Sequence, residues 1–126
     1  FELNGKWYYA GNMVLFKGPQ TIDGVKVYFD QGGVQVKGYF ARDYSDNNKR
    51  YYDKDSGALV TNNYVNAYDN YTHQNERYYV DEQGIRVKGA KTINGKQVYF
   101  TYDGRQVFDN FGDDGYFYDQ DGNRVD

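Results

Sequence analysis

The sequence contains no cysteine and only one proline. The missing cysteines exclude disulfide bridges and thiolate metal sites, and Pro19 lies in a segment that we expect to link two repeats. No stretch approaches the roughly 20 apolar residues that cross a bilayer. Lysine and arginine are scattered and the net charge is −3, so we expect neither a membrane nor a nucleic acid as partner.

Hydrophobic residues are few but aromatic residues are many. The mean hydropathy of −0.98 argues against a thick core, whereas an aromatic content of 20%, with 16 tyrosines and 8 phenylalanines, argues against disorder. A thin core built from packed rings satisfies both observations, because each buried aromatic side chain removes about 150–250 Å² from water.

The chain repeats one pattern six times: an aromatic strand, a turn with Gly or Asp/Asn, and a second strand that ends in Val or Phe. Residues 24–38 and 75–89 match without a gap. Equivalent positions follow each other at spacings of 20, 23, 28, 20 and 18 residues, at Tyr9, Phe29, Tyr52, Val80, Phe100 and Tyr118. Short repeats of this kind bury their apolar faces only against their neighbours. We therefore predict an all-β fold, a β-solenoid of consecutive short β-hairpin repeats.

Residues 1–126 are expected to form a single module of about six hairpin units. Each hairpin is expected to join the aromatic strand to the strand after it, as in 27–29 and 34–36, through the turn 30–33. The near-identical segments 18–24 and 89–95 are expected to be linkers between hairpins. The longer, irregular segments 39–48 and 62–75 are also expected to be linkers, and to carry individual function. Because the chain starts and stops inside the pattern, we expect it to be a fragment of a longer protein.

Strand alternation predicts which ring of each aromatic pair faces the core. Phe29, Val80 and Phe100 are expected to point inward. Their neighbours with polar tips are expected to point outward, at Tyr28, Tyr79 and Tyr99.

An exposed ring beside amide and amine groups suits a sugar, whose C–H face stacks on the ring while its hydroxyls need donors and acceptors. Thr21, Tyr28, Gln35 and Lys37 supply these groups and form the first candidate pocket. Stacking over about 100 Å² contributes roughly 2–3 kcal/mol before entropy costs. One such site binds at about millimolar strength, and several sites on one polymer gain by effective concentration.

Two further candidate pockets are incomplete versions of the first. The second keeps the ring and the lysine at Tyr79 and Lys88 but has Arg86 in place of glutamine. The third keeps Thr92, Tyr99 and Gln106, with a phenylalanine in place of the lysine. For any one of these tyrosines, packing between hairpins is the alternative.

The segments 20–24, 27–30 and 33–38 resemble the repeats of the glucan-binding region of bacterial glucansucrases, within the broader group of cell-wall and choline-binding-like repeats. The resemblance covers essentially the whole chain. It implies a β-solenoid that holds α-glucan with a stacking tyrosine and neighbouring Gln, Lys and Thr, here Tyr28, Gln35, Lys37 and Thr21. It also implies a secreted or cell-surface protein whose sugar-transfer machinery lies in a separate, covalently attached catalytic domain.

Two other functions stay open. The chain could anchor a protein to a cell wall or host receptor by binding choline, or a glycan other than α-glucan, as related choline-binding and clostridial toxin repeats do. Choline cages need about three aromatic residues, often tryptophan, and this chain has a single tryptophan, Trp7. A spacer without any ligand is the remaining possibility.

No enzymatic residues, cofactor or metal are expected. Paired catalytic carboxylates need a cleft, which a narrow solenoid lacks, and most acidic residues occupy turns. The segment 53–57 resembles the start of a calcium loop but lacks the later ligands, so we interpret it as a hairpin turn. His73 is the only histidine and is expected at the surface.

Overall fold

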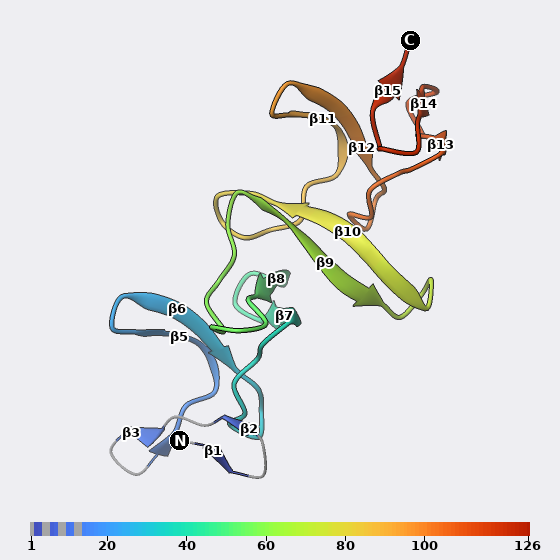
Figure 1. The fold of residues 1–126 in the computed structure, drawn as a ribbon. Helices are drawn as coiled ribbons and strands as arrows, with labels where there is room; N and C mark the ends of the chain where they lie inside the picture. Colours follow the sequence, from blue (N-terminus) through green and yellow to red (C-terminus); the bar gives the residue numbers. More distant parts are fainter. Residues whose placement is uncertain (1, 4–5, 8–9, 12–13) are drawn as a thin grey trace. The chain divides into compact units, whose positions relative to one another are not determined.

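The computed structural model describes residues 2–3, 6–7, 10–11 and 14–126, with side chains from residue 16 onward. In this part of the chain all regular secondary structure is β-strand (Figure 1), which confirms the all-β prediction. The repeat expected around Tyr9 lies outside the described residues. No helix in the described part is long and apolar enough to cross a membrane.

The strands are short and pair with their neighbours in the sequence. They are β1 (Glu2–Leu3), β2 (Lys6–Trp7), β3 (Ala10–Gly11), β4 (Val14–Leu15), β5 (Gly18–Ile22), β6 (Val25–Phe29), β7 (Tyr39–Asp43), β8 (Asn48–Tyr52), β9 (Asn63–Asp69), β10 (Gln74–Val80), β11 (Gly89–Ile93), β12 (Lys96–Phe100), β13 (Asn110–Phe111), β14 (Phe117–Tyr118) and β15 (Arg124–Val125). Consecutive strands form antiparallel two-stranded sheets up to β12, and β13, β14 and β15 form one three-stranded sheet.

The predicted pairing of each aromatic strand with the segment after it is present, as single bridges in four repeats and as the β14–β15 pair. The longer hairpins, however, join the aromatic strand to the strand before it, which the prediction missed. β5 pairs with β6 and β11 with β12, through two-residue turns at Asp23-Gly24 and Asn94-Gly95. All four turn residues have φ between 52° and 80°, the conformation of a tight hairpin turn. These dipeptides are strong hairpin signals that the linker interpretation overlooked.

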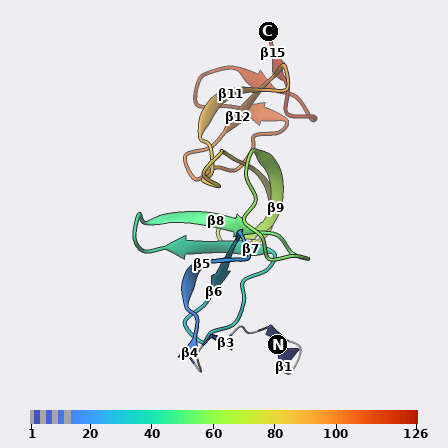
Figure 2. The same ribbon diagram turned by 90° about the vertical axis from the view of Figure 1, so that its left-hand side faces the viewer.

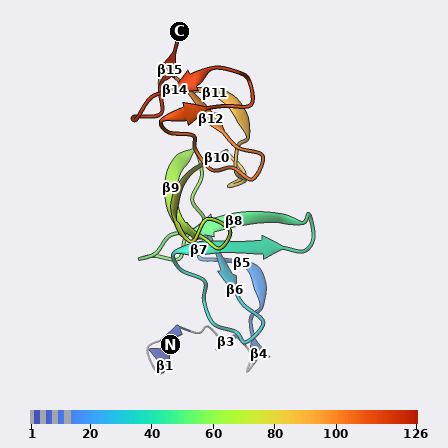
Figure 3. The same cartoon turned by 90° about the vertical axis from the view of Figure 1, so that its right-hand side faces the viewer.

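The segments expected to be linkers contain strands, because the strand before each aromatic strand is its main pairing partner. The segment 39–48 contains all of β7, and 62–75 contains all of β9. Pro19 also lies in a strand, opposite Tyr28; a proline is tolerated there because the hairpin has only two strands. The β7–β8 hairpin can be followed along its length in Figure 2 and from the other side in Figure 3.

The expected turn after each aromatic strand is present and holds a shorter return segment. Asp30 accepts hydrogen bonds from the backbone N–H groups of Gly32 and Val34, both at 2.9 Å. The return segment pairs through a single bridge, Phe29 with Gln35. A glycine with φ between 75° and 93° closes the turn in five repeats, at Gly33, Gly57, Gly84, Gly104 and Gly122.

The described structure forms two compact units, residues 1–61 and 62–126. In the first, Tyr28, Val36 and Tyr52 form a buried cluster. In the second, Ile93, Val98 and Phe100 do so. Both clusters combine rings with aliphatic side chains: Tyr28 and Tyr52 are the buried rings of the first, and Phe100 is that of the second.

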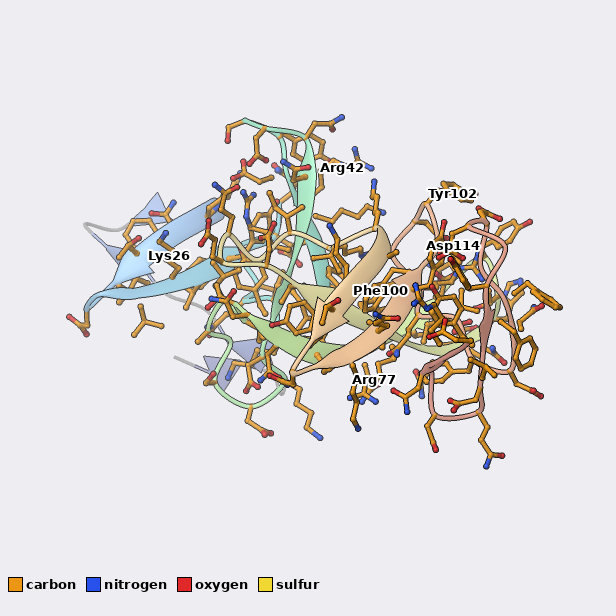
Figure 4. All side chains as sticks on the ribbon, turned by 90° about the horizontal axis from the view of Figure 1, so that it is seen from above. Lys26, Arg42, Arg77, Phe100, Tyr102 and Asp114 are labelled. Atoms are coloured by element: carbon orange, nitrogen blue, oxygen red, sulfur yellow. The ribbon has the colours of Figure 1, made fainter. Side chains whose placement is uncertain are left out.

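Backbone hydrogen bonds join consecutive repeats inside each unit. The N–H of Leu59 donates to the carbonyl of Lys26 in the first unit, and the N–H of Gln106 donates to that of Arg77 in the second, both at 2.8 Å. Lys26 and Arg77 are labelled in Figure 4. These two return segments are thereby joined to the preceding hairpin in the same way.

Candidate functional site

The predicted inward residues are buried, but the predicted outward orientation is wrong for Tyr28. Phe29, Val80 and Phe100 are 0–2% exposed, and Phe100 is labelled in Figure 4. Tyr28 is only 6% exposed. Tyr28 does point to the opposite face of the strand from Phe29, but that face is not exposed to solvent because the next repeat covers it.

The side chain of Tyr28 is held on all sides by protein. Its hydroxyl donates to the carbonyl of Arg42 at 2.7 Å, and its ring packs on Tyr52 with 5.6 Å between centroids. Burial, with the nearby Tyr44 and Asp43, raises the pKa of Tyr28. Tyr99 repeats this packing on Tyr118, at 5.7 Å.

The bridge geometry separates Tyr28 from Gln35. Gln35 pairs with Phe29, whereas the N–H of Val36 bonds to the carbonyl of Tyr28, and Val36 packs with Tyr28 in the core. Neighbouring residues point to opposite faces, so the structure does not bring Tyr28 and Gln35 together. Thr21 shares the face of Tyr28 by cross-strand pairing and is exposed.

Gln35 and Lys37 instead meet at the turn of the following repeat. A Cβ atom on Gly57 would lie 2.3 Å from Nε2 of Gln35 and 3.4 Å from Cε of Lys37. Both side chains are half-buried. We call Gln35, Lys37 and Gly57 the first junction; a polar amide and a lysine line it beside a glycine that leaves room for them.

Sequence reasoning missed Tyr39, which lies two residues after Lys37 and is 47% exposed. Its hydroxyl has a raised pKa, caused by partial burial and by the charges of Asp30 and Tyr28. Tyr39 thus offers the accessible ring that Tyr28 does not. Its position directly after the Lys-Gly pair that closes the repeat could have suggested it.

The second predicted site is divided between two faces in the same manner. Arg86 pairs with Val80, while the N–H of Val87 bonds to the carbonyl of Tyr79. Tyr79 is half-buried and packs edge-on against Tyr64 at 5.1 Å. Lys88 is exposed.

Arg86 also reaches the turn of the following repeat. Nη1 donates to the carbonyl of Asp103 at 3.0 Å, and a Cβ on Gly104 would lie 3.0 Å from Cδ of Arg86. We call Arg86 and Gly104 the second junction. Burial lowers the pKa of Arg86.

The third predicted site has an exposed Thr92, a half-buried Tyr99 and a buried Gln106. Gln106 is 6% exposed. A Cβ on Gly122 would lie 2.5 Å from its Nε2 and 3.0 Å from Cε1 of Phe108. Gln106, Phe108 and Gly122 form the third junction.

No group of acidic or histidine side chains in the described part of the chain is arranged to hold a metal ion. Oδ2 of Asp53 accepts hydrogen bonds from the backbone N–H groups of Asp55 and Ser56, both at 2.9 Å, which confirms a hairpin turn there. His73 is exposed in the turn of the β9–β10 hairpin, with φ of 58°.

Comparison with known proteins places these repeats in a recognisable group. Residues 16–64 match the choline-binding repeat family. The chain is 40% identical over 108 residues to glucosyltransferase-S of Streptococcus mutans serotype c, which covers 85% of this chain and 7% of the relative. It is also 40% identical over 128 residues to glucosyltransferase-S of Streptococcus downei, with coverage of 97% and 9%.

Among solved structures, choline binding protein F of Streptococcus pneumoniae, crystallised with a peptidoglycan analogue, aligns with a TM-score of 0.67 and 29% identity. The match covers 100% of this chain and 39% of that one. The chain spans less than a tenth of the length of the glucosyltransferases that it resembles. The predicted resemblance is confirmed: the chain consists of repeats of the kind found in streptococcal glucosyltransferases, within the wider group of choline-binding-like repeats.

Proposed function

We propose that this chain is a non-catalytic carbohydrate-binding module that binds α-glucan of the dextran or isomaltooligosaccharide type. The observation that carries the proposal is the 40% identity with segments of two glucosyltransferases over 85% and 97% of the chain. In this proposal the module serves a covalently attached catalytic domain of a glucosyltransferase that acts on sucrose. The parent protein is secreted or displayed on the bacterial surface, where its polymer is made.

The first junction is the proposed binding site. Gln35 offers a donor and an acceptor and Lys37 offers donors, both at the edge of one turn. Tyr39, 47% exposed, supplies a ring on which a sugar can stack. Tyr28 supports this site from the core, and Thr21 borders the other face of the hairpin. The predicted contributions of Tyr79, Lys88, Thr92, Tyr99 and Gln106 to further sites stay predictions.

We also propose that the hairpins stack as a β-solenoid and that residues 1–126 form one module. The hydrogen bonds from Leu59 to Lys26 and from Gln106 to Arg77 support stacking, because two separate units use the same connection between successive repeats. Amide hydrogen exchange tests this. The N–H groups of Leu59 and Gln106 should exchange as slowly as those inside the hairpins; fast exchange of both would contradict stacking in solution.

Native electrophoresis through gels that contain dextran tests the function. The wild-type chain should be retarded, and Lys37→Met and Tyr39→Ala should each reduce the retardation because they remove a donor and a stacking ring. Lys49→Met is the matched control, since Lys49 is exposed on β8 and its substitution removes the same charge. Equal migration of the wild type with and without dextran would contradict the proposal.

Choline binding is the second candidate, favoured by the match of residues 16–64 to the choline-binding repeat family. It predicts that millimolar choline raises the melting temperature by mass action, while dextran leaves it unchanged. The reverse pattern supports α-glucan. No change with either ligand indicates a spacer or a module for another glycan.

A further inference from the structure

Four of the repeats can be divided into two kinds by the residues that they have at two equivalent positions. One position lies two residues before the last residue of the aromatic strand, and the other lies on the return segment. Two repeats combine valine with glutamine and two combine tyrosine with arginine: Val27 with Gln35, Val98 with Gln106, Tyr78 with Arg86, and Tyr116 with Arg124. The repeat that contains Arg50 and Leu59 has neither combination.

The tyrosine and the arginine contact each other in both repeats that have them. The guanidinium carbon of Arg86 lies 4.4 Å from the ring centroid of Tyr78, and that of Arg124 lies 4.3 Å from the ring of Tyr116. Both distances are within the range of a favourable cation–π contact. The same geometry therefore arises twice, in different surroundings, from the same pair of residues.

Arg86 also connects its own hairpin to the next repeat. Its ring partner Tyr78 is fully buried and donates its hydroxyl to Oδ2 of Asp69 at 2.8 Å. On the other side Arg86 donates to the carbonyl of Asp103, in the turn that ends at Gly104. The long side chain thus spans the second junction with a protein partner at each end.

The valine–glutamine repeats leave the equivalent position with a shorter, uncharged group. Nε2 of Gln35 and of Gln106 approaches the next turn glycine, but no ring lies at the equivalent of Tyr78. The oxygen and nitrogen atoms of buried side-chain amides normally find hydrogen-bond partners. Oε1 of Gln106, in a side chain only 6% exposed, has no hydrogen-bond partner in the described part of the chain. An acceptor of this kind suits a hydroxyl donor.

We propose that the Tyr78–Arg86 pair closes the second junction to carbohydrate, and that the valine–glutamine combination keeps the first junction open. This inference rests on the proposed function and adds to it which junctions bind. Arg86 then fastens two repeats together, and its predicted contact with ligand is replaced by contacts with Tyr78 and Asp103.

Amide chemical shifts during a titration with isomaltotriose test the inference site by site. In the wild-type chain the N–H signal of Gly57 should shift and that of Gly104 should not. In Arg86→Gln, which shortens the side chain and leaves Tyr78 in place, the Gly104 signal should shift as well. In Gln35→Arg, which places the longer, charged side chain at the first junction, the Gly57 shift should be lost. Gln120→Arg adds the same charge at an exposed turn and should titrate like the wild type.

The outcomes separate the two claims. If no signal of the wild-type chain shifts, the proposed function fails and the inference fails with it. If Gly57 shifts but Gly104 stays unchanged in a folded Arg86→Gln, only the inference is overturned. A wild-type Gly104 shift that disappears in Arg86→Gln would also overturn it, because Arg86 would then be a ligand residue. Should Arg86→Gln fail to fold, Gln35→Arg decides: retention of the Gly57 shift overturns the inference.

Discussion

Comparing Gly57→Ala with Gly24→Ala should separate an effect on the stability of the fold from an effect on glucan binding at the first junction. Gly57 has φ of 75° and Gly24 has φ of 80°, so an alanine at either position costs about 1–2 kcal/mol of backbone strain. At about 4 °C per kcal/mol for a chain of this size, both variants should melt about 4–8 °C lower than the wild type. Thermal unfolding followed by circular dichroism measures this.

The two variants should differ in binding. The new Cβ would lie 2.3 Å from Nε2 of Gln35 at Gly57, whereas nothing lies within 4 Å of it at Gly24. Gln35 must therefore move in Gly57→Ala, and dextran should no longer retard that variant, while Gly24→Ala should bind normally. Equal retardation of the two variants would refute the claim that Gln35 at this turn forms the site.

Two further predictions concern the first unit. Tyr28→Phe should destabilise by about 1 kcal/mol through loss of the bond to Arg42 and Tyr28→Ala by about 3–5 kcal/mol, whereas Tyr44→Ala, at a residue 77% exposed, should change the free energy of unfolding by less than about 0.5 kcal/mol. Urea unfolding measures all three, and a Tyr28→Ala as mild as Tyr44→Ala would show that Tyr28 is not core. The hydrogen bond from Arg50 lowers the pKa of Asp46 to about 2, so its stabilising contribution is present above pH 4 and is lost as the pH falls toward 2. Asp46→Asn should remove that part of the acid dependence of the melting temperature, and an unchanged profile would contradict it.

The all-β class and the repeat equivalences could be predicted because they depend on local patterns. The turn at Asp30 follows from side-chain chemistry that caps nearby N–H groups, and the positive φ of Gly57 follows from the equivalent turn at Asp53. The inward positions of Phe29 and Phe100 were also predictable, since both residues are apolar in alternating strands.

The pairing of strands and the burial of Tyr28 were harder to predict, because they depend on which neighbour covers each face. Two-residue turns at Asp23-Gly24 and Asn94-Gly95 pair each aromatic strand with the segment before it, which the sequence pattern had indicated to be a linker. Once those hairpins form, the next repeat packs on the face of Tyr28. A composition rich in tyrosine cannot distinguish a ring that packs between repeats from one that meets solvent, such as Tyr39.

The most direct test of the account is a crystal structure of this chain with isomaltotriose. We expect a glucose unit stacked on Tyr39, with its hydroxyls within hydrogen-bond distance of the side chains of Gln35 and Lys37. Sugar bound only in the second unit, or an empty first junction at a saturating concentration of isomaltotriose, would contradict the account.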